Sequence, residues 1–201
     1  MKKNVLTLLA VLALSTAAFA QTPTEFGIKA GVNIANYGGD IEGTDARTGL
    51  HVGVVAEMKL SDNFSVQPEL LYSMQGATYS ESFDDVPGEI TDKLDFILLP
   101  VMAKYYIIDG LSLEVGPQFG ILLSAKSEAE AGGETAEADI EVYRNFDMAL
   151  NGGVGYELPM GLFVQARYSL GVTNIIEDTN DSIDDFVLTN NNFQLSVGYK
   201  F

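Results

Sequence analysis

The sequence contains no cysteine and no tryptophan, and its one histidine is His51. Without cysteine the chain has neither disulfide cross-links nor a thiolate nucleophile, so its stability must come from packing, backbone hydrogen bonds or a membrane. No serine stands at a spacing from His51 that makes a catalytic set of serine, histidine and acid recognisable. The mid-strand glycines lie outside any phosphate-binding motif. We therefore expect a protein that is not an enzyme and that has no catalytic or cofactor-binding residues.

Basic residues are also scarce, with 11 lysines and arginines against 28 aspartates and glutamates. The formal net charge is −17. Nucleic-acid binding depends on neutralising phosphates with basic side chains, so this composition disfavours a nucleic-acid partner. The same excess of acids disfavours simple electrostatic adsorption onto anionic lipid.

The first twenty residues have the pattern of an export signal. Lys2 and Lys3 precede a short apolar run over residues 5–13, and a small-residue cleavage pattern ends at Ala20. The run is shorter than the roughly 20 residues of a spanning helix, which argues against the alternative of a membrane anchor. We predict a cleavable signal peptide over residues 1–20 and one barrel domain over residues 21–201. The mature chain then has 9 basic and 28 acidic residues, a net charge of −19.

Apolar and polar residues alternate through most of the mature sequence, and a period of two indicates β-strands. Eight segments show this alternation. Most are ten residues or longer, whereas strands of soluble proteins average about 5–6 residues. A membrane strand needs about 9–11 tilted residues. The eight segments are residues 26–34, 49–60, 64–75, 97–105, 111–123, 145–157, 162–172 and 192–201.

The connections between these segments alternate in length. Residues 61–63, 109–110 and 159–161 are tight turns, whereas residues 36–48, 80–92, 124–141 and 174–186 are expected to form long loops. Short turns at one end and long loops at the other are typical of outer-membrane barrels. We predict an all-β fold, an eight-stranded antiparallel up-and-down transmembrane β-barrel with both termini in the periplasm. Pro68, Pro100 and Pro117 remove backbone donors and predict bulges or kinks.

A soluble periplasmic barrel of the lipocalin type, binding an apolar ligand, would also alternate. Two features favour lipid. The polar face is rich in glycine, serine, asparagine and glutamine, which suit a narrow interior better than a charged soluble exterior. Aromatic residues of apolar-face parity also gather at the strand ends predicted to be periplasmic, as in the girdle of a membrane barrel. These aromatic residues are Phe26, Phe64, Tyr105, Tyr156, Tyr199 and Phe201.

The final strand ends in Leu195, Val197, Tyr199 and the terminal Phe201, which resemble the C-terminal signal read by the barrel-assembly machinery. Further segments resemble a known family over the whole mature chain: GIKAGVN from Gly27, QPELLY from Gln67, LPVMAKYY from Leu99, GPQFG from Gly116, GYEL from Gly155 and ARY from Ala166. The chain resembles the porin-family or PorT-like outer-membrane β-barrel domain, with an architecture similar to small OmpA- and OmpX-type barrels. The resemblance implies the fold and a location in the outer membrane. It does not imply a common reaction.

Charged residues of both signs have the parity of the barrel interior, where they must pair and hydrogen-bond. We predict a salt-bridged polar network that fixes the barrel's shape, and we include His51 in it. The alternative is a narrow, low-conductance pore for small solutes, although eight strands leave little lumen. The predicted interior network consists of Lys29, His51, Glu57, Lys59, Glu69, Lys104, Glu114, Asp147, Glu157, Arg167 and Lys200.

The four expected loops hold 19 of the 28 acidic residues. They are either solvated and mutually repelling or a surface for a cation or a basic extracellular partner. Asp178, Asn180 and Asp184 have the every-second-residue spacing of a calcium loop, but the glycine and the final glutamate of an EF-hand are missing. We keep them as a calcium hypothesis and expect no other cofactor. The interpretation of the sequence that we favour is a monomeric surface-interaction barrel in contact with outer-membrane lipid.

Overall fold

The structure, a computed structural model, describes residues 24–41, 43–83, 86–140, 142–176 and 187–201. All of its elements are antiparallel strands. No helix in these residues is long and apolar enough to cross a membrane. The strands are β1 (Thr24–Gly39), β2 (Thr44–Ser61), β3 (Phe64–Gln75), β4 (Ala77–Phe83), β5 (Val86–Ile108), β6 (Leu111–Ala131), β7 (Glu134–Asp139), β8 (Phe146–Glu157), β9 (Leu162–Gly171) and β10 (Leu188–Lys200).

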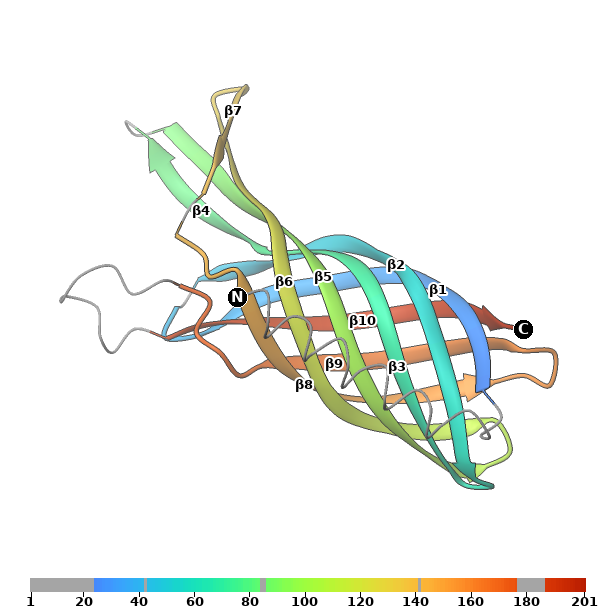
Figure 1. Ribbon diagram of the computed structural model, residues 1–201. Coiled ribbons are helices and arrows are strands. Elements are labelled where there is room, and N and C mark those ends of the chain that lie inside the picture. The colour runs from blue at the N-terminus through green and yellow to red at the C-terminus, as the bar shows by residue number, and fades with distance from the viewer. Residues whose placement is uncertain (1–23, 42, 84–85, 141, 177–186) are drawn as a thin grey trace, which may run out of the picture.

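Eight of these strands close into a ring (Figure 1). Each strand of the ring pairs with the next one along the chain once β4 and β7 are left out, and β1 pairs with β10 to close the barrel. The closing seam is long, running in continuous register from Gly27 opposite Lys200 to Gly39 opposite Leu188. The predicted eight-stranded up-and-down antiparallel barrel is confirmed.

The remaining two strands correct the prediction of long loops. β4 pairs with the start of β5, and β7 pairs with the end of β6, where loops were expected over residues 80–92 and 124–141. Together β4, β5, β6 and β7 form a sheet that projects beyond the barrel (Figure 1), which we call the extension. Tyr79, Ile90, Ala129 and Ala136 lie opposite one another as a row across the four strands of the extension. The many acidic residues around them hide this pattern in the sequence.

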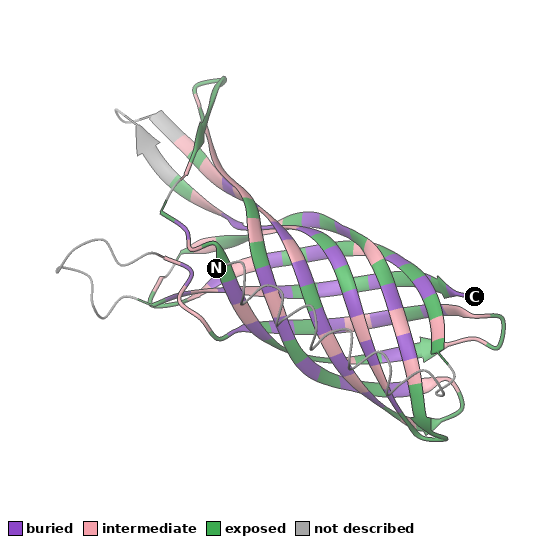
Figure 2. Cartoon of the chain, in the orientation of Figure 1, coloured by how far each residue is buried: buried purple, intermediate pink, exposed green. Residues whose placement is uncertain are grey.

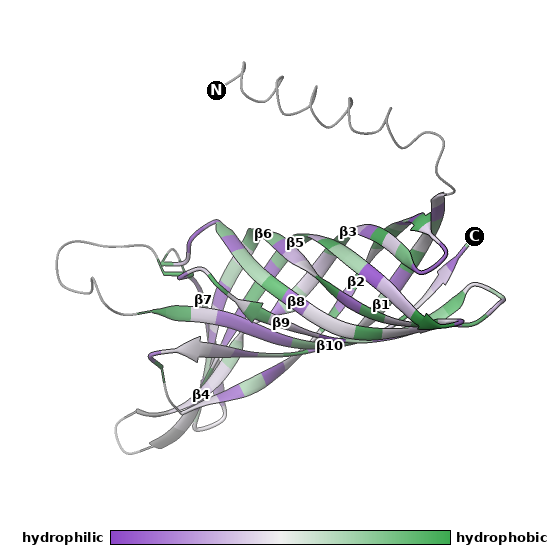
Figure 3. Ribbon diagram, turned by 90° about the horizontal axis from the view of Figure 1, so that it is seen from below, coloured by the Kyte–Doolittle hydropathy of each residue, from purple (hydrophilic) through white to green (hydrophobic). Residues whose placement is uncertain are grey.

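Burial alternates along every strand of the barrel, as Figure 2 shows. The outward side chains are apolar and exposed: Ile28 is 57% exposed, Val54 52% and Leu113 50%. An exposed belt of this kind is what a lipid-facing surface requires. The six aromatic residues of the predicted girdle are all exposed and lie at the short-turn end, where the C-terminus also lies. The same alternation appears as hydropathy in Figure 3.

Bulges occur, but not at the prolines. The ladders shift register between Lys59 and Ser61, between Asp95 and Phe96, and between Tyr106 and Ile108. The ladders show no register shift at Pro68, Pro100 or Pro117, so bulges at these prolines were predicted wrongly. Pro68 and Pro100 remain paired with Val101 and Gln118, so the ladder tolerates a missing donor without inserting a residue.

Candidate functional site in the barrel interior

Inward-facing side chains fill the barrel in three layers between its two ends. The layer nearest the short turns, which we call the ionic layer, contains Lys29, Glu57, Glu69, Lys104, Glu114, Glu157, Arg167 and Lys200. Above it lies an amide layer of Asn33, His51, Asn190, Asn192, Gln194 and Ser196. At the long-connection end lies an apolar plug of Tyr37, Leu71, Ala77, Leu94, Phe96, Leu98, Tyr143, Ile175 and Leu188.

Glu69 on β3 is the centre of the first group of charges. It accepts two hydrogen bonds from the Arg167 guanidinium, at 2.8 and 2.9 Å, and one from Lys29 Nζ at 2.8 Å. Arg167 also reaches Glu114 at 3.1 Å, and Gln165 bridges Lys29 and Glu114. Paired donors and acceptors of this kind are the strong geometry for an arginine and a carboxylate. The group thereby ties β1, β3, β6 and β9 together across the barrel.

Glu57 on β2 is the centre of the second group. It accepts hydrogen bonds from Lys104 at 2.8 Å, from Tyr106 at 2.5 Å and from Lys200. Lys200 also pairs with Glu157 at 2.5 Å. The second group thereby ties β2, β5, β8 and β10 together across the barrel.

The ionic layer as a whole is charge-balanced. It has four cations, Lys29, Lys104, Arg167 and Lys200, and four carboxylates, Glu57, Glu69, Glu114 and Glu157. All except Glu157 are 4% exposed or less. Removing one member of such a buried set leaves its partners uncompensated in a low dielectric, which typically costs about 3–5 kcal/mol. The layer can hold the barrel's cross-section in shape.

Two residues of the predicted interior network, Lys59 and Asp147, lie outside the ionic layer. Lys59 is exposed and pairs with Glu25 at 2.9 Å. It keeps regular register, opposite Ser65, but it lies near the short-turn end of β2, so its side chain is at the rim of the barrel. Its place in the interior network is corrected accordingly. Asp147 is buried, but its partner is the Thr173 hydroxyl at 2.6 Å, and it forms no ion pair among the described residues.

His51 lies in the amide layer between two side chains from neighbouring strands. Its Nδ1 is 2.8 Å from Asn33 Oδ1 and its Nε2 is 2.8 Å from Ser196 Oγ. The contact with Ser196 crosses over β1, and Gly31 makes this possible: a Cβ there would lie 2.7 Å from the imidazole. Sequence spacing could not reveal this set, because 145 residues separate His51 from Ser196.

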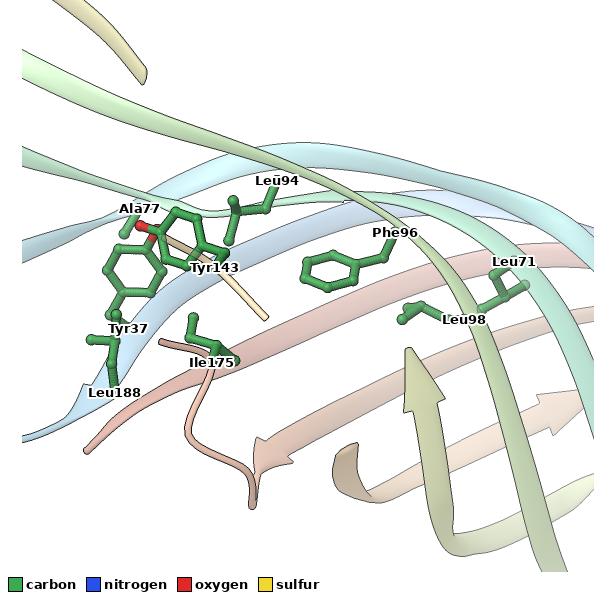
Figure 4. Packing of buried hydrophobic residues seen from close by; sticks show 9 residues of the cluster. All are labelled: Tyr37, Leu71, Ala77, Leu94, Phe96, Leu98, Tyr143, Ile175 and Leu188. Atoms are coloured by element: carbon green, nitrogen blue, oxygen red, sulfur yellow. The ribbon is translucent and has the colours of Figure 1, made fainter. Parts of the chain in front are cut away.

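The plug extends inward from the long-connection end. Figure 4 shows Tyr37, Tyr143 and Ala77 grouped together, with Phe96, Leu98 and Leu71 following along the interior. Tyr143 and Ile175 come from two connections that are joined by the bridge of Tyr143 with Ile176. Asp92 accepts hydrogen bonds from Tyr37 at 3.0 Å and from Tyr143 at 2.6 Å. Burial raises the pKa of the Tyr143 hydroxyl, which therefore remains a donor.

The plug was absent from the sequence prediction. The predicted interior consisted of polar and charged residues, and it did not include Leu94, Phe96 or Leu98. A signal was present, since residues 96–99 are apolar on both faces, a pattern typical of strands buried on both sides. Tyr143 and Ile175 lie in connections, where no periodicity marks them.

The remaining predicted sites are placed as follows. Asp178, Asn180 and Asp184 lie outside the described residues. Within the part of the chain that is described, no group of three or more histidine, cysteine, aspartate or glutamate side chains could hold a metal ion. Leu195, Val197 and Tyr199 point outward on β10, and Phe201 is 77% exposed.

Comparisons with known proteins agree with this architecture. The chain belongs to the family of outer membrane protein beta-barrel domains, whose model matches residues 19–177. It is an integral β-barrel of the outer membrane. No curated protein matches the sequence.

Solved structures of small barrels resemble the chain at low identity. Neisserial surface protein A has a TM-score of 0.51 at 10% identity, with 89% of this chain and 99% of that one covered, and this likeness supports the fold alone. The attachment invasion locus protein Ail of Yersinia pestis gives 0.47 at 14% identity, covering 88% and 98%. OprG of Pseudomonas aeruginosa gives 0.48 at 14% identity, covering 91% and 98%.

Proposed function

We propose that this protein is a non-catalytic surface-interaction barrel whose extension presents acidic side chains to a basic partner outside the cell. Long connections of outer-membrane barrels face the exterior. The extension projects from that end, and all six residues of its edge strand β7 are exposed.

The observation that carries the proposal is the pairing of like charges on the extension. Glu89 lies directly opposite Glu130, and Glu128 lies directly opposite Glu137. Like charges in such cross-strand positions destabilise a sheet. Glu128 and Glu137 are compensated by Lys93 and Lys126, with distances of 2.6 Å in both ion pairs. Glu89 and Glu130 are exposed and form no ion pair among the described residues, so a cationic partner would relieve their repulsion.

The filled interior supports a scaffold over the alternative of a narrow pore. The ionic layer leaves its charges paired with each other, and the plug covers the opposite end. A planar-bilayer recording tests this choice. We expect no reproducible ion-selective openings, and such openings would favour the pore.

Binding of decalysine to the purified barrel in phosphatidylcholine nanodiscs tests the surface proposal. We expect salt-sensitive binding that the double substitution Glu89→Gln and Glu130→Gln weakens about fivefold, since each exposed charge pair contributes modestly. The matched control removes two acids from the other end, with Asp62→Asn and Asp109→Asn. Equal binding by both double variants would contradict a site on the extension.

We also propose that residues 1–20 are cleaved on export and that Leu195, Val197, Tyr199 and Phe201 form the signal for the barrel-assembly machinery. The outward, exposed positions of these four side chains support this role. Deleting Phe201 is expected to lower the amount of folded, heat-modifiable barrel in the outer membrane. Mass spectrometry of the mature protein is expected to find Gln21 at the amino terminus.

A further inference from the structure

The amide layer contains buried oxygen atoms that have no donor. Among the described residues, Asn190 Oδ1, Asn192 Oδ1 and Gln194 Oε1 are buried without a hydrogen-bond partner. The three side chains are at most 3% exposed and occupy successive inward positions of β10. Side chains at such positions lie about 7 Å apart, so their oxygens form a file along the barrel wall. An unpaired buried acceptor is costly, so it calls for an explanation.

The orientation of the Asn192 and Gln194 amides follows from their contacts with Asn33. Asn33 Nδ2 donates to the carbonyl oxygens of Leu50 and Met74, at 3.1 and 2.8 Å, so Asn33 cannot be turned around. Its Oδ1 therefore faces the interior as an acceptor. Asn192 and Gln194 both direct their amide nitrogens to this atom, at 3.3 and 3.4 Å. His51 Nδ1 also lies 2.8 Å from the same oxygen. The oxygens of Asn192 and Gln194 point away from it and have no hydrogen-bond partner among the described residues.

Asp92 places a carboxylate beside this file of oxygens. Asp92 and Asp147 are both 4% exposed and form no ion pair among the described residues. Asp92 lies close to the file, because Tyr37, which binds its carboxylate, is the register partner of Asn190. In contrast, the ionic layer is already neutral, so its cations are not available to compensate these two carboxylates.

We propose that the amide layer binds a monovalent cation through the side-chain oxygens of Asn192 and Gln194, with Asn190 extending the site along β10. Carbonyl-type oxygens can replace the hydration shell of a monovalent ion. A divalent ion would require a cluster of carboxylates, which the described residues do not provide. The cation would satisfy the unpaired oxygens and offset the nearby negative charge.

Thermal unfolding of the mature barrel in nanodiscs tests the site, with NaCl, KCl or RbCl replacing choline chloride at constant ionic strength. We expect a saturable rise in Tm with one or more alkali cations, since a ligand that binds only the folded state stabilises it. ²³Na NMR is expected to show line broadening that competing potassium reverses. Stability that is the same in all four salts, with no broadening, would overturn the proposal and leave water as the partner of these oxygens.

Two substitutions of similar size separate the site from general effects. Asn192→Leu removes an unpaired oxygen and is expected to abolish the cation dependence, without loss of stability in choline chloride. Asn151→Leu is the control, because Asn151 is equally buried but its amide is already paired with Ser169 and Gln118. It is expected to lower Tm in every salt and keep the cation dependence. Cation dependence retained in Asn192→Leu would place the ion elsewhere. If Asn192→Leu does not fold, Gln194→Met provides the same comparison.

Discussion

The two halves of the barrel interior are filled by different chemistry. Near the short turns, eight charged side chains neutralise one another, and Glu69 and Glu57 each accept from two cations. At the long-connection end, nine mostly apolar side chains pack together, and Tyr37 and Tyr143 share one carboxylate, Asp92. Both solutions fill the narrow interior of an eight-stranded barrel. The two halves differ in the substitutions that they tolerate.

The difference is one of specificity. Charges in a low dielectric require defined partners, so the ionic layer constrains which strands lie opposite one another. Apolar packing is non-directional, so the plug needs only volume and can recruit Ile175 and Tyr143 from the connections. The barrel therefore has a selective half and an adaptable half, and substitutions in each are expected to behave differently.

Glu69→Gln is expected to have the largest effect. It leaves Lys29 and Arg167 buried without their main countercharge, and the free energy of unfolding should fall by about 4 kcal/mol. Urea unfolding in a lipid bilayer measures this loss. A fall below about 1 kcal/mol would mean that water or other carboxylates compensate these cations, and the ionic layer would not be selective.

Leu94→Ala tests the plug. Truncating a fully buried leucine should lower the free energy of unfolding by about 3 kcal/mol through lost contacts and the cavity that remains. Leu123→Ala, on the exposed outer face, is the control and should cost less. Equal losses at the two positions would indicate that the plug is not tightly packed.

Tyr143→Phe should cost about 2 kcal/mol, because a hydrogen bond to a buried carboxylate is lost while the ring is kept. Urea unfolding is again the measurement. The raised pKa of Tyr143 predicts that the difference between the variant and the parent stays constant from neutral pH to pH 10. A difference that disappears within that range would show that the hydroxyl ionises there.

Lys59→Ala should have the smallest effect, below about 0.5 kcal/mol, because its ion pair with Glu25 is exposed. Lys104→Ala, within the ionic layer, is the comparison and should cost several times more. If the two losses were equal in urea unfolding, Lys59 would belong to the interior network after all.

Strand alternation was sufficient to predict the barrel. Inside and outside were correctly assigned for residues such as Lys29, Ile28 and Val54, because a period of two leaves only two faces. The turn-forming residues at 61–63, 109–110 and 159–161 predicted which end of the barrel has the short connections. The extension was missed because Glu128, Glu130 and Glu134 read as a charged loop, although backbone pairing requires no apolar residues.

Partners within the interior could not be predicted from the sequence. Inward parity indicates that Glu69 and Arg167 share a space, but their contact depends on the stagger of four strands, which small shifts in register decide. Lys59 shows a second limit: its parity is inward, but its position near the end of β2 places the side chain at the rim, paired with Glu25. Connections such as the one containing Tyr143 have no period from which to infer burial.

β5 and β6 run without interruption from the short turn at Asp109 to the extension. Their ladder extends from Ile108 opposite Leu111 up to Gly88 opposite Ala131, with two register shifts along the way. A pull on the extension therefore acts along the strands, in shear, and is shared by many backbone hydrogen bonds at once. The extension is in this sense a mechanical anchor: tension from an attached partner would pass directly into the barrel wall instead of bending a loop.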